Sequence, residues 1–474
     1  MANRKSGNVM ASILNNNSDP SLRITLAAVV ALALPAIIEQ VMVTLVNYVD
    51  TAMVGSLGSV ATASVGLTAS TTWLLNGVLN AAAVGFSVQV AHMVGARNYK
   101  EAREITGQAL KFVILGGLIM FLIAFGISFP LPTLLGASGD VKESASLYFR
   151  IYSFGVPFNF TVLMLSAIIR CSGDTKTPMF LNFGINILNV IFNFLFIYDT
   201  RELTLFGKSF TMWGLGLGVA GAALGSIMAL FIIAMCYVLV IFRRETPVKL
   251  IKGENYSFRK TTLSSTLKIG LPVLFERTLM SFAQVVITSV ITRIGTAAIA
   301  ANHLAVSAES LSYLPANGVS TAGTTLIGQA LGAGRKDLAK KFSRIVLIIG
   351  AVMMTGGGIM LYCLSENLIA IFSADPEVIK LGGSVLRIVA FAEPFFALSI
   401  VSNGILRGAG DTKGPFLISL ITMWGVRITL AFALSGRFGL HGVWIAMAIE
   451  LFARGMLYFI RVMRGKWMNF KVIK

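Results

Sequence analysis

The chain has 474 residues, of which 55% are hydrophobic and only 13% are charged, and its mean hydropathy is +0.79. A soluble protein would carry about 25% charged residues, so this composition excludes a soluble globular protein. Apolar runs of about 20 residues, long enough to cross a bilayer as helices, recur along the whole chain. They also exclude a β-barrel, whose strands alternate polar and apolar residues.

The net charge of +18 would suggest a nucleic-acid partner in a soluble protein, but here the positive charges fall in short loops between apolar runs. We therefore expect no nucleic-acid partner, and a lipid bilayer as the surroundings. The three cysteines and three histidines are scattered without ligand spacing, which argues against a disulfide framework and against a metal site built from them.

Twelve apolar segments predict an all-α polytopic membrane protein with twelve transmembrane helices. In chain order they cover residues 24–53, 61–93, 105–129, 147–169, 178–198, 217–242, 267–291, 297–330, 342–364, 378–406, 415–434 and 440–463. Alternate loops are rich in Lys and Arg, whereas the other loops together hold only Lys142, Arg201, Lys208, Arg293 and Arg437. Because cytoplasmic loops carry the excess of Lys and Arg, both termini are predicted to be cytoplasmic, in a protein of the cell (inner or plasma) membrane.

The second half of the sequence repeats the first at an offset of 237 residues. Motifs that begin at Leu34, Gly95 and Gly173 recur at Leu271, Gly332 and Gly410. Since each half has six spans, both halves enter the membrane from the same side, which predicts two six-helix lobes related by pseudo-two-fold symmetry along the membrane normal. The predicted parts are a tail (1–22), an N-lobe (23–243), a cytoplasmic linker (244–265), a C-lobe (266–464) and a second tail (465–474).

The motif GDTK occurs at Gly173–Lys176 and again at Gly410–Lys413, each time followed by a proline two residues later. Glycine just past a helix end, aspartate in the turn and proline in the next first turn are typical of a tight connection between two helices. No phosphate-cradling P-loop is present, so the sequence does not support ATP hydrolysis, and we expect no enzyme activity.

The first helix is apolar but carries Glu39, Asn47 and Asp50. A carboxylate at the centre of a membrane helix costs roughly 3 kcal/mol, so these side chains are predicted to face protein or water. Asp50 is either a cation- or proton-binding carboxylate or a solvated residue near the helix end. Glu39 is the repeat counterpart of Glu276, whereas Asp50 has none, because the same offset leads to Ile287.

Four asparagines share one face of the fifth helix, because they are spaced by four, three and four residues: Asn182, Asn186, Asn189 and Asn193. Such a stripe would be costly against lipid and is predicted to face the lobe interior. It could simply join helices by hydrogen bonds, particularly at Asn182 and Asn186. Asn189 and Asn193 lie at a depth similar to that of Asp50, and Ser226 in the sixth helix could join them.

Two coupling ions fit these side chains. One carboxylate, two amide carbonyls and a hydroxyl make an all-oxygen set that suits Na⁺ at Asp50. Alternatively, Asp50 alone could carry a proton. Residue pattern leaves the choice between Na⁺ and H⁺ open, and no other cofactor is expected.

The second half carries its own charged residues within the spans. Arg427 lies mid-span and needs a partner, for which we predict Glu276. This pair is either a purely structural ion pair or part of a C-lobe site. Glu393 precedes Pro394 in the tenth span, and Glu450 with Arg454, four residues apart, is predicted to form an ion pair within one helix.

These motifs resemble the MATE (multidrug and toxic compound extrusion) family over nearly the whole chain, residues 24–467. The resemblance rests on LPAIIEQ, VDTAMVG, the paired R-x₂-GDTK-x-P turns, the run AIAANHLAVSAESLSYLPANGVSTAGTTLIGQALGAG and GVWIAMAIELFARG. It implies twelve helices in two lobes with a V-shaped cleft, and antiport of organic cations against Na⁺ or H⁺.

The resemblance also implies residue roles. Asp50 matches the first-helix aspartate that the family uses for coupling, Asn189 and Asn193 match the fifth-helix pair, and Ser226 matches a hydroxyl position only loosely. Some members have aspartate where this chain has Asn193, which leaves one carboxylate here. Glu276 matches a C-lobe glutamate of some members, and Glu393 lies one turn from the expected second C-lobe carboxylate near Phe396. We therefore expect coupling in the N-lobe.

The function predicted from these observations is secondary active efflux of amphipathic organic cations by a protein acting as a monomer. Rocking of the two lobes would expose a cleft to each side in turn, with Glu39, Asn47 and Asn186 as candidate polar residues of the cleft. Export of a lipid-linked saccharide or another amphiphile is the alternative, and it would require a strongly basic central cavity.

Overall fold

The computed structural model describes the chain except for residues 1–12, 14–19, 138, 206–207, 252 and 473–474, and the side chains of 46–48 and 203–210 are also undescribed. The chain forms two compact units. Unit 1 contains residues 1–40, 91–98 and 263–474, and unit 2 contains residues 41–90 and 99–262. The start of the first helix thus groups with the second half of the chain, and the predicted boundaries at 243 and 266 stay a prediction.

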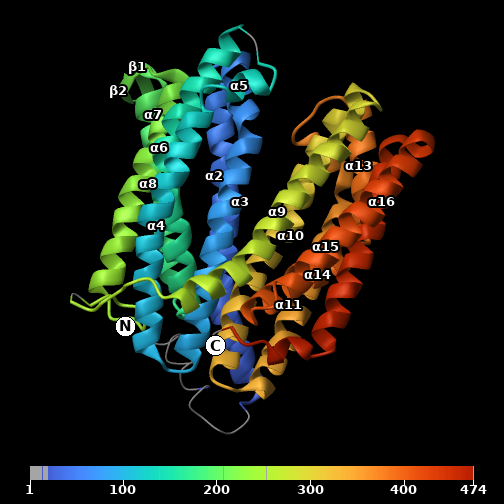
Figure 1. Ribbon diagram of the computed structural model, residues 1–474. Coiled ribbons are helices and arrows are strands. Elements are labelled where there is room, and N and C mark those ends of the chain that lie inside the picture. The colour runs from blue at the N-terminus through green and yellow to red at the C-terminus, as the bar shows by residue number, and fades with distance from the viewer. Residues whose placement is uncertain (1–12, 14–19, 138, 206–207, 252, 473–474) are drawn as a thin grey trace. The chain divides into compact units, whose positions relative to one another are not determined.

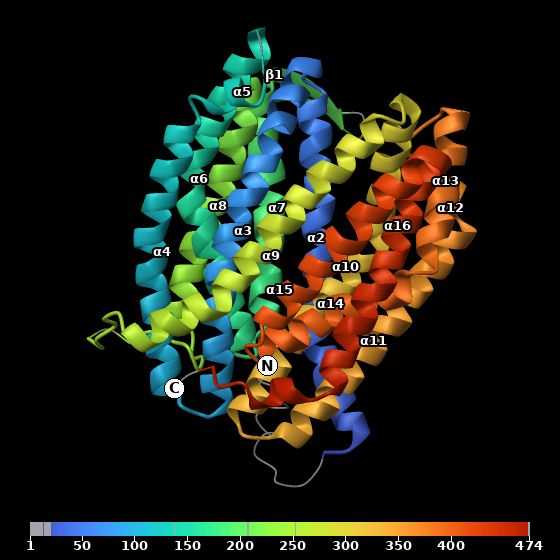
Figure 2. The same ribbon diagram turned by 45° about the vertical axis from the view of Figure 1, so that its right-hand side comes forward.

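Two long helices run from one unit into the other: α2 (Leu22–Gly55) and α3 (Ser59–Gly95). The other elements of unit 2 are α4 (Tyr99–Ile127), α5 (Leu131–Leu134), α6 (Gly139–Cys171), α7 (Lys176–Ile197), β1 (Asp199–Leu205), β2 (Lys208–Leu215) and α8 (Gly218–Arg243). Figures 1 and 2 show α4, α6, α7 and α8 side by side within this unit. A core of aliphatic side chains and Tyr237 joins α6 and α8.

Strands β1 and β2 form an antiparallel hairpin between α7 and α8. The described residues of the second half have no such hairpin at the corresponding connection, where Gly439 lies. Only glycine fits at position 214 of β2, because a Cβ atom there would lie 2.1 Å from the Tyr198 carbonyl oxygen.

Unit 1 is all helical among its described residues. Its elements are α9 (Lys260–Thr292), α10 (Thr296–Gly332), α11 (Lys336–Cys363), α12 (Ser365–Ala370), α13 (Pro376–Ala390), α14 (Glu393–Gly408), α15 (Lys413–Leu420), the π-helix η1 (Ile421–Ile428), α16 (Thr429–Met463) and the 3₁₀ turn η2 (Lys466–Asn469). Two buried hydrophobic clusters hold it together, and one of them includes residues of α2.

Helix starts recur along the chain at the predicted offset of 237 residues. Ser59, Tyr99, Gly139 and Lys176 begin helices, and so do Thr296, Lys336, Pro376 and Lys413. One pair of counterparts differs: α6 continues through Pro157, whereas α13 and α14 meet at 61° just before Pro394. A proline removes one helical hydrogen bond and its ring clashes with the carbonyl four residues back, here Ala390. That carbonyl packs against Gly358, where a Cβ atom would lie only 2.7 Å away.

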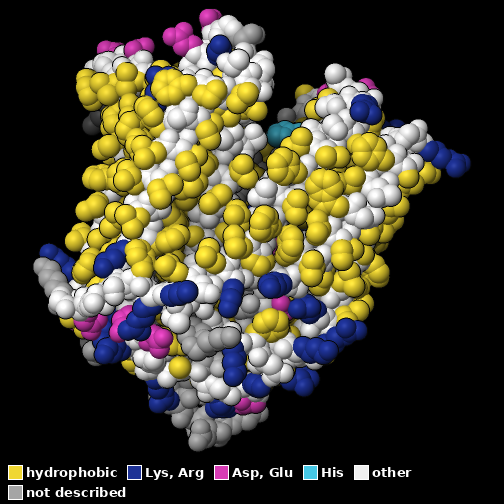
Figure 3. Space-filling view, in the orientation of Figure 1, with side chains coloured by type: hydrophobic (Ala, Val, Ile, Leu, Met, Phe, Trp, Pro, Cys, Tyr) yellow, Lys and Arg dark blue, Asp and Glu magenta, His cyan; other side chains and the backbone are white. Residues whose placement is uncertain are grey.

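Nine helices of the described residues are long and apolar enough to cross a membrane, or ten if the bent pair α13–α14 counts as one span. One of the nine, Lys413–Met463, is 51 residues long and contains Gly439 in a non-helical conformation with φ 56°. In Figure 3 hydrophobic side chains cover the long middle of the helices, and Lys and Arg side chains gather toward the lower part of the view. The protein is therefore a multi-pass, nearly all-helical membrane protein.

The GDTK motifs form the tight turns that the sequence predicts. Gly173 and Gly410 have φ of 101° and 82°, the left-handed region that favours glycine. Asp174 accepts a hydrogen bond from the backbone N–H of Thr177 (3.0 Å), and Asp411 accepts one from Gly414 (3.2 Å). Each aspartate also pairs with an arginine, Arg244 at 3.3 Å and Arg461 at 2.7 Å, so both connections are held by the same chemistry.

Candidate functional site

The four side chains predicted around Asp50 lie together in unit 2. Asn193 Nδ2 donates a hydrogen bond of 2.7 Å to Asp50 Oδ1 and lies 3.2 Å from Asn189 Oδ1. Asn189 Nδ2 in turn donates to Ser226 Oγ at 2.9 Å. The hydrogen-bonded chain Asp50–Asn193–Asn189–Ser226 thus joins α2, α7 and α8, and we call it the Asp50 chain.

Local sequence explains why these groups meet. Asn186, Asn189 and Asn193 are buried on one face of α7, as their spacing predicts. Small residues on α8 let the two helices approach closely: a Cβ atom at Gly225 would lie 2.4 Å from Asn193 Oδ1, and one at Gly221 would lie 2.3 Å from the Phe196 carbonyl oxygen. Larger residues on α8 would push α7 away and pull Asn193 from Asp50.

The orientation of the amides differs from a pure oxygen cage. Asn193 presents its nitrogen to Asp50, while its oxygen is buried without a hydrogen-bond partner. In this orientation the Asp50 carboxyl group is held by the Asn193 amide N–H and has no oxygen of Asn193 facing it. Rotation of the Asn193 amide by 180° would instead present its oxygen to a cation beside Asp50.

A second polar group in unit 2 was not singled out from the sequence. Asn159 Nδ2 donates a hydrogen bond of 2.6 Å to Asn76 Oδ1, and Tyr152 is hydrogen-bonded to Asn76. Tyr148 stacks on Tyr152, with ring centroids 6.5 Å apart, and lies near enough to Asp50 to interact electrostatically. Each of these residues is isolated in an apolar segment, so only the packing of α3 against α6 brings them together.

Unit 1 corrects one predicted ion pair. Glu276 Oε2 lies 3.0 Å from Arg407 Nη2, while Asn403 and Ser419 donate to Glu276 Oε1 at 3.1 and 3.2 Å. The predicted pairing of Glu276 with Arg427 is therefore wrong. Arg407 lies at the end of α14, after the 61° bend, and spacing in the sequence does not reveal that it meets Glu276.

Arg427 belongs to a separate buried polar cluster of unit 1, formed by Glu309, Glu393, Arg427, Glu450 and Arg454. Arg427 Nη2 lies 3.0 Å from Met447 Sδ and interacts electrostatically with Glu450 and Glu309. The predicted ion pair within α16 is confirmed, with Glu450 Oε1 at 3.1 Å from Arg454 Nε. Glu393 is fully buried and accepts a hydrogen bond of 2.6 Å from Ser312 Oγ.

Glu309 is the member of this cluster that the sequence reasoning missed. It is a single carboxylate in α10, almost fully buried, and its Oε1 lacks a hydrogen-bond partner. Its only signal in the sequence is a single acid within the apolar segment 297–330. Three carboxylates and two guanidinium groups therefore share one buried region.

The three candidate polar residues of the cleft do not belong to the Asp50 chain. Glu39 is buried in the part of α2 that belongs to unit 1, and the Asp50 chain belongs to unit 2. Asn186 is buried, and its Nδ2 has no hydrogen-bond partner among the described residues. The side chain of Asn47 lies outside the described part of the structure. Their roles in a cleft stay predictions.

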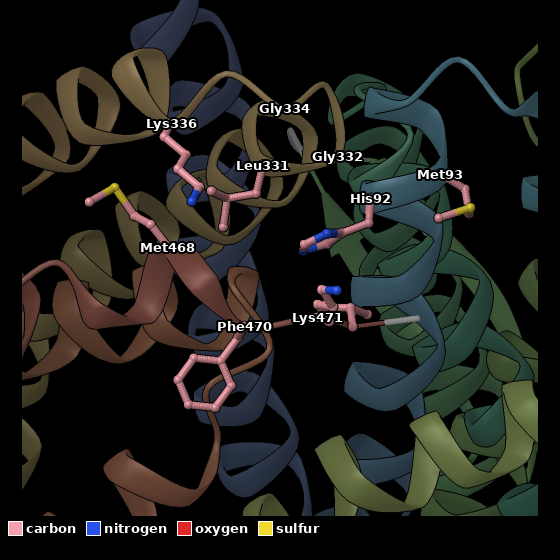
Figure 4. Close-up of a pocket in the computed structure, with 10 residues that line it drawn as sticks. His92, Met93, Leu331, Gly332, Gly334, Lys336, Met468, Phe470 and Lys471 are labelled. Atoms are coloured by element: carbon pink, nitrogen blue, oxygen red, sulfur yellow. The ribbon is translucent and has the colours of Figure 1, made fainter. Parts of the chain in front are cut away.

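A pocket of about 230 Å³ lies beside the carboxyl-terminal segment of unit 1. Figure 4 shows His92, Lys336 and Lys471 converging on it from α3, α11 and the last residues. His92 Nε2 is hydrogen-bonded to the Gly408 carbonyl oxygen at 2.9 Å. The pocket lies at helix ends and contains none of the site residues predicted from the sequence. Among the described residues, no group of three His, Cys, Asp or Glu side chains could hold a metal ion.

A protein-family model and known proteins match this chain over most of its length. A protein-family model described as MatE matches residues 35–195 and again 272–433, so the two matches begin at the offset of the internal repeat. The chain is 31% identical over 450 residues to a "Probable multidrug resistance protein NorM" of Thermotoga maritima, with 92% of each chain covered. It is 26% identical to "Uncharacterized transporter YisQ" of Bacillus subtilis, with 93% of this chain and 94% of that protein covered.

Solved structures share the fold. A transporter of the MOP superfamily from Pyrococcus furiosus superposes with a TM-score of 0.87 at 21% identity, covering 98% of this chain and 99% of that chain. A structure described as a "multidrug resistance MATE family transporter" in an outward-facing conformation gives the same values. The doubled family match and the extended similarity to the Thermotoga protein establish that this chain belongs to the MATE family of efflux transporters, which are not enzymes.

Proposed function

We propose that the protein is a secondary multidrug antiporter that exports amphipathic organic cations and is driven by inward flow of H⁺ or Na⁺ through the Asp50 chain. The observation that carries this proposal is the Asp50 carboxylate within α2, which accepts a hydrogen bond of 2.7 Å from the Asn193 amide of α7. Intramembrane carboxylates are costly and mark ion or proton pathways. Each elementary charge that falls through 100 mV supplies about 2.3 kcal/mol for export.

Twelve spans are part of the proposal. The nine membrane-length helices become ten if the segment Lys413–Met463 is divided at Gly439, eleven with the bent pair α13–α14, and twelve with α10. This count gives six spans before and six after the linker, and it supports cytoplasmic termini and two lobes that rock in a cell membrane. The recurrence of helix starts in both halves supports the same arrangement.

Drug substrates are proposed because the Thermotoga maritima relative is described as a probable multidrug resistance protein. Export of a lipid-linked saccharide, the alternative, would call for a strongly basic interior. Acids outnumber arginines in the buried polar cluster of unit 1, and Asp50 is acidic in unit 2, so the interior charges favour organic cations.

The test is efflux of a fluorescent organic cation from proteoliposomes that contain the purified full chain. Asp50→Asn keeps the hydrogen bond to Asn193 but removes the charge, and we expect it to abolish gradient-driven transport. Asp140→Asn, an exposed acid at the start of α6, is the matched control and is expected to transport normally. Undiminished transport by Asp50→Asn would exclude the proposed coupling site.

The same vesicles distinguish the coupling ions when the Na⁺ gradient and the pH gradient are imposed separately. A response to the pH gradient alone assigns the proton, in keeping with the amide nitrogen that faces Asp50, and a response to Na⁺ alone assigns the cation with the Asn193 amide reversed. Transport that follows neither gradient would contradict antiport altogether.

A further inference from the structure

A pocket lies at the end of unit 2 that is opposite the linker. It brings two cationic side chains, Lys142 and Arg150, to the level of the membrane surface. It has a volume of about 470 Å³ and is lined by Phe129, Lys142, Glu143, Ser146, Leu147 and Arg150. Gly139 begins α6, so Arg150 lies eleven residues into that helix, about 16 Å along its axis. This depth matches the end of α4 at Ile127, next to Phe129, which is the level at which the hydrocarbon gives way to headgroups.

At this level the guanidinium group of Arg150 lacks part of its hydrogen-bond partners. Its guanidinium stacks on the Phe129 ring, 4.3 Å from the ring centroid, and its Nη2 donates to Ser146 Oγ at 3.3 Å. Its Nε is buried without a hydrogen-bond partner, and it forms no ion pair with any described residue. An arginine within a membrane helix is costly unless an anion neutralises it, and the planar guanidinium matches the geometry of a phosphate.

The surroundings of the pocket are apolar and exposed. Leu147, Phe154 and Phe129 are each about half exposed, and α4 presents a further exposed apolar row at Ile114, Leu118 and Leu122. Within a bilayer such side chains contact acyl chains. An anion that reaches Arg150 from this side therefore carries its own hydrocarbon.

We propose that this pocket binds the phosphodiester of a membrane phospholipid, with the Arg150 guanidinium on the phosphate and the acyl chains along α4 and α6. Lys142 adds attraction for the negative charge, and Glu143 at the rim weakens it. The proposal is independent of the transport mechanism, and only the leaflet, the outer one, depends on the proposed topology.

The test is native mass spectrometry of the purified full chain in detergent, titrated with phosphatidylglycerol. Arg150→Gln is expected to weaken the tightest lipid adduct at least tenfold, and Arg150→Lys is expected to fall between the two because it keeps charge without the planar fork. The control Arg293→Gln removes an exposed positive charge from the same predicted side, outside the pocket, and is expected to change affinity less than twofold.

Two exposed positions keep the proposal testable if Arg150→Gln does not fold. Lys142→Gln is expected to weaken binding about fivefold and Glu143→Gln to strengthen it. Equal affinity in all variants, or an equal loss in Arg293→Gln, would overturn the site. Displacement of the lipid by an equal concentration of water-soluble glycerophosphate would overturn the lipid as its ligand.

Discussion

At the scale of single residues, the Glu276 carboxylate is bound on both oxygens. Arg407 holds one oxygen, and Asn403 and Ser419 hold the other. Tyr458, which is hydrogen-bonded to Ser419 at 3.0 Å, extends the network into α16. A carboxylate with this many partners is a structural group, which agrees with our placement of coupling at Asp50.

We expect Arg407→Gln to lower the stability of the purified protein by about 3 kcal/mol, because removing one partner leaves the other charge buried. The double variant with Glu276→Gln should recover about 1 to 2 kcal/mol of that loss, since the two side chains interact directly. Thermal unfolding in detergent measures both effects.

The control is a second double-mutant cycle, which combines Glu276→Gln with Arg427→Gln. Because Arg427 contacts Met447 instead, the two losses should add to within about 0.5 kcal/mol. Strong coupling between Glu276 and Arg427, with none between Glu276 and Arg407, would show that Arg427 is the partner of Glu276 after all.

Residue-level prediction succeeded where chemistry depends on short spacing. The asparagine steps on α7, the ion pair Glu450–Arg454 and the GDTK turns all follow from helical periodicity and local turn rules, and the structure confirms them. The partner of Glu276 depends on how α9 and α14 cross, and the burial of Glu309 depends on how α10 packs against its neighbours. Nothing in the linear pattern encodes that crossing, because apolar helices pack in many registers at similar energy.

At the scale of elements, the linker after α8 is attached to α4 within unit 2. Arg103 Nη2 lies 3.2 Å from Glu254 Oε1, and Arg259 Nη2 lies 2.5 Å from Glu104 Oε2. The Tyr256 ring fills a notch at Gly107, where a Cβ atom would lie 2.3 Å from it. The basic linker seen in the sequence is therefore a docked segment, not a free tether.

Docking of this linker should depend on pH. The hydrogen bond from Arg103 lowers the pKa of Glu254 below its usual 4.5. A lowered pKa means that the pair stabilises docking above pH 4.5 and that this contribution is lost as the pH falls through the lower value of the docked state. Hydrogen exchange of residues 253–262, corrected for its intrinsic pH dependence, should rise over that range.

Glu254→Gln should exchange faster than the wild type at pH 7 and should lose the pH response. Glu245→Gln serves as the control, because the partner of that exposed acid among the described residues is Lys249, inside the linker itself. An unchanged exchange profile in Glu254→Gln would show that the Tyr256 contact alone holds the linker.

The elements also show what periodicity cannot predict. Every predicted span coincides with helix, because runs of 20 apolar residues have no other stable form in lipid. The 61° bend before Pro394, the π-helix at Ile421–Ile428 and the β-hairpin were not predicted. Pro157 occupies the repeat position of Pro394 and leaves its helix continuous, so a proline at this position is not sufficient to bend the helix.

At the scale of the whole molecule, the topology can be tested by chemical labelling. In a variant without the three native cysteines, Ser257→Cys in the linker should react with a membrane-impermeant maleimide only after the cells are opened. Arg293→Cys, in the turn between α9 and α10, should react on intact cells, because α9 separates the two positions.

The opposite pattern would place the termini outside, and labelling of both positions on intact cells would show that α9 does not span. Residues of this loop are exposed in the structure, so a failure to react cannot result from burial in the protein.

The hairpin β1–β2 interrupts the likeness of the two halves, since the second half has only a short connection at Gly439. Under the proposed topology it emerges on the outer surface of the cell, tied to α7 and α8 by two short connections. An antibody or a short epitope tag at this hairpin would therefore report how many copies reach the surface of living cells. Counting copies in this way separates a variant that has lost transport from one that was never delivered to the membrane.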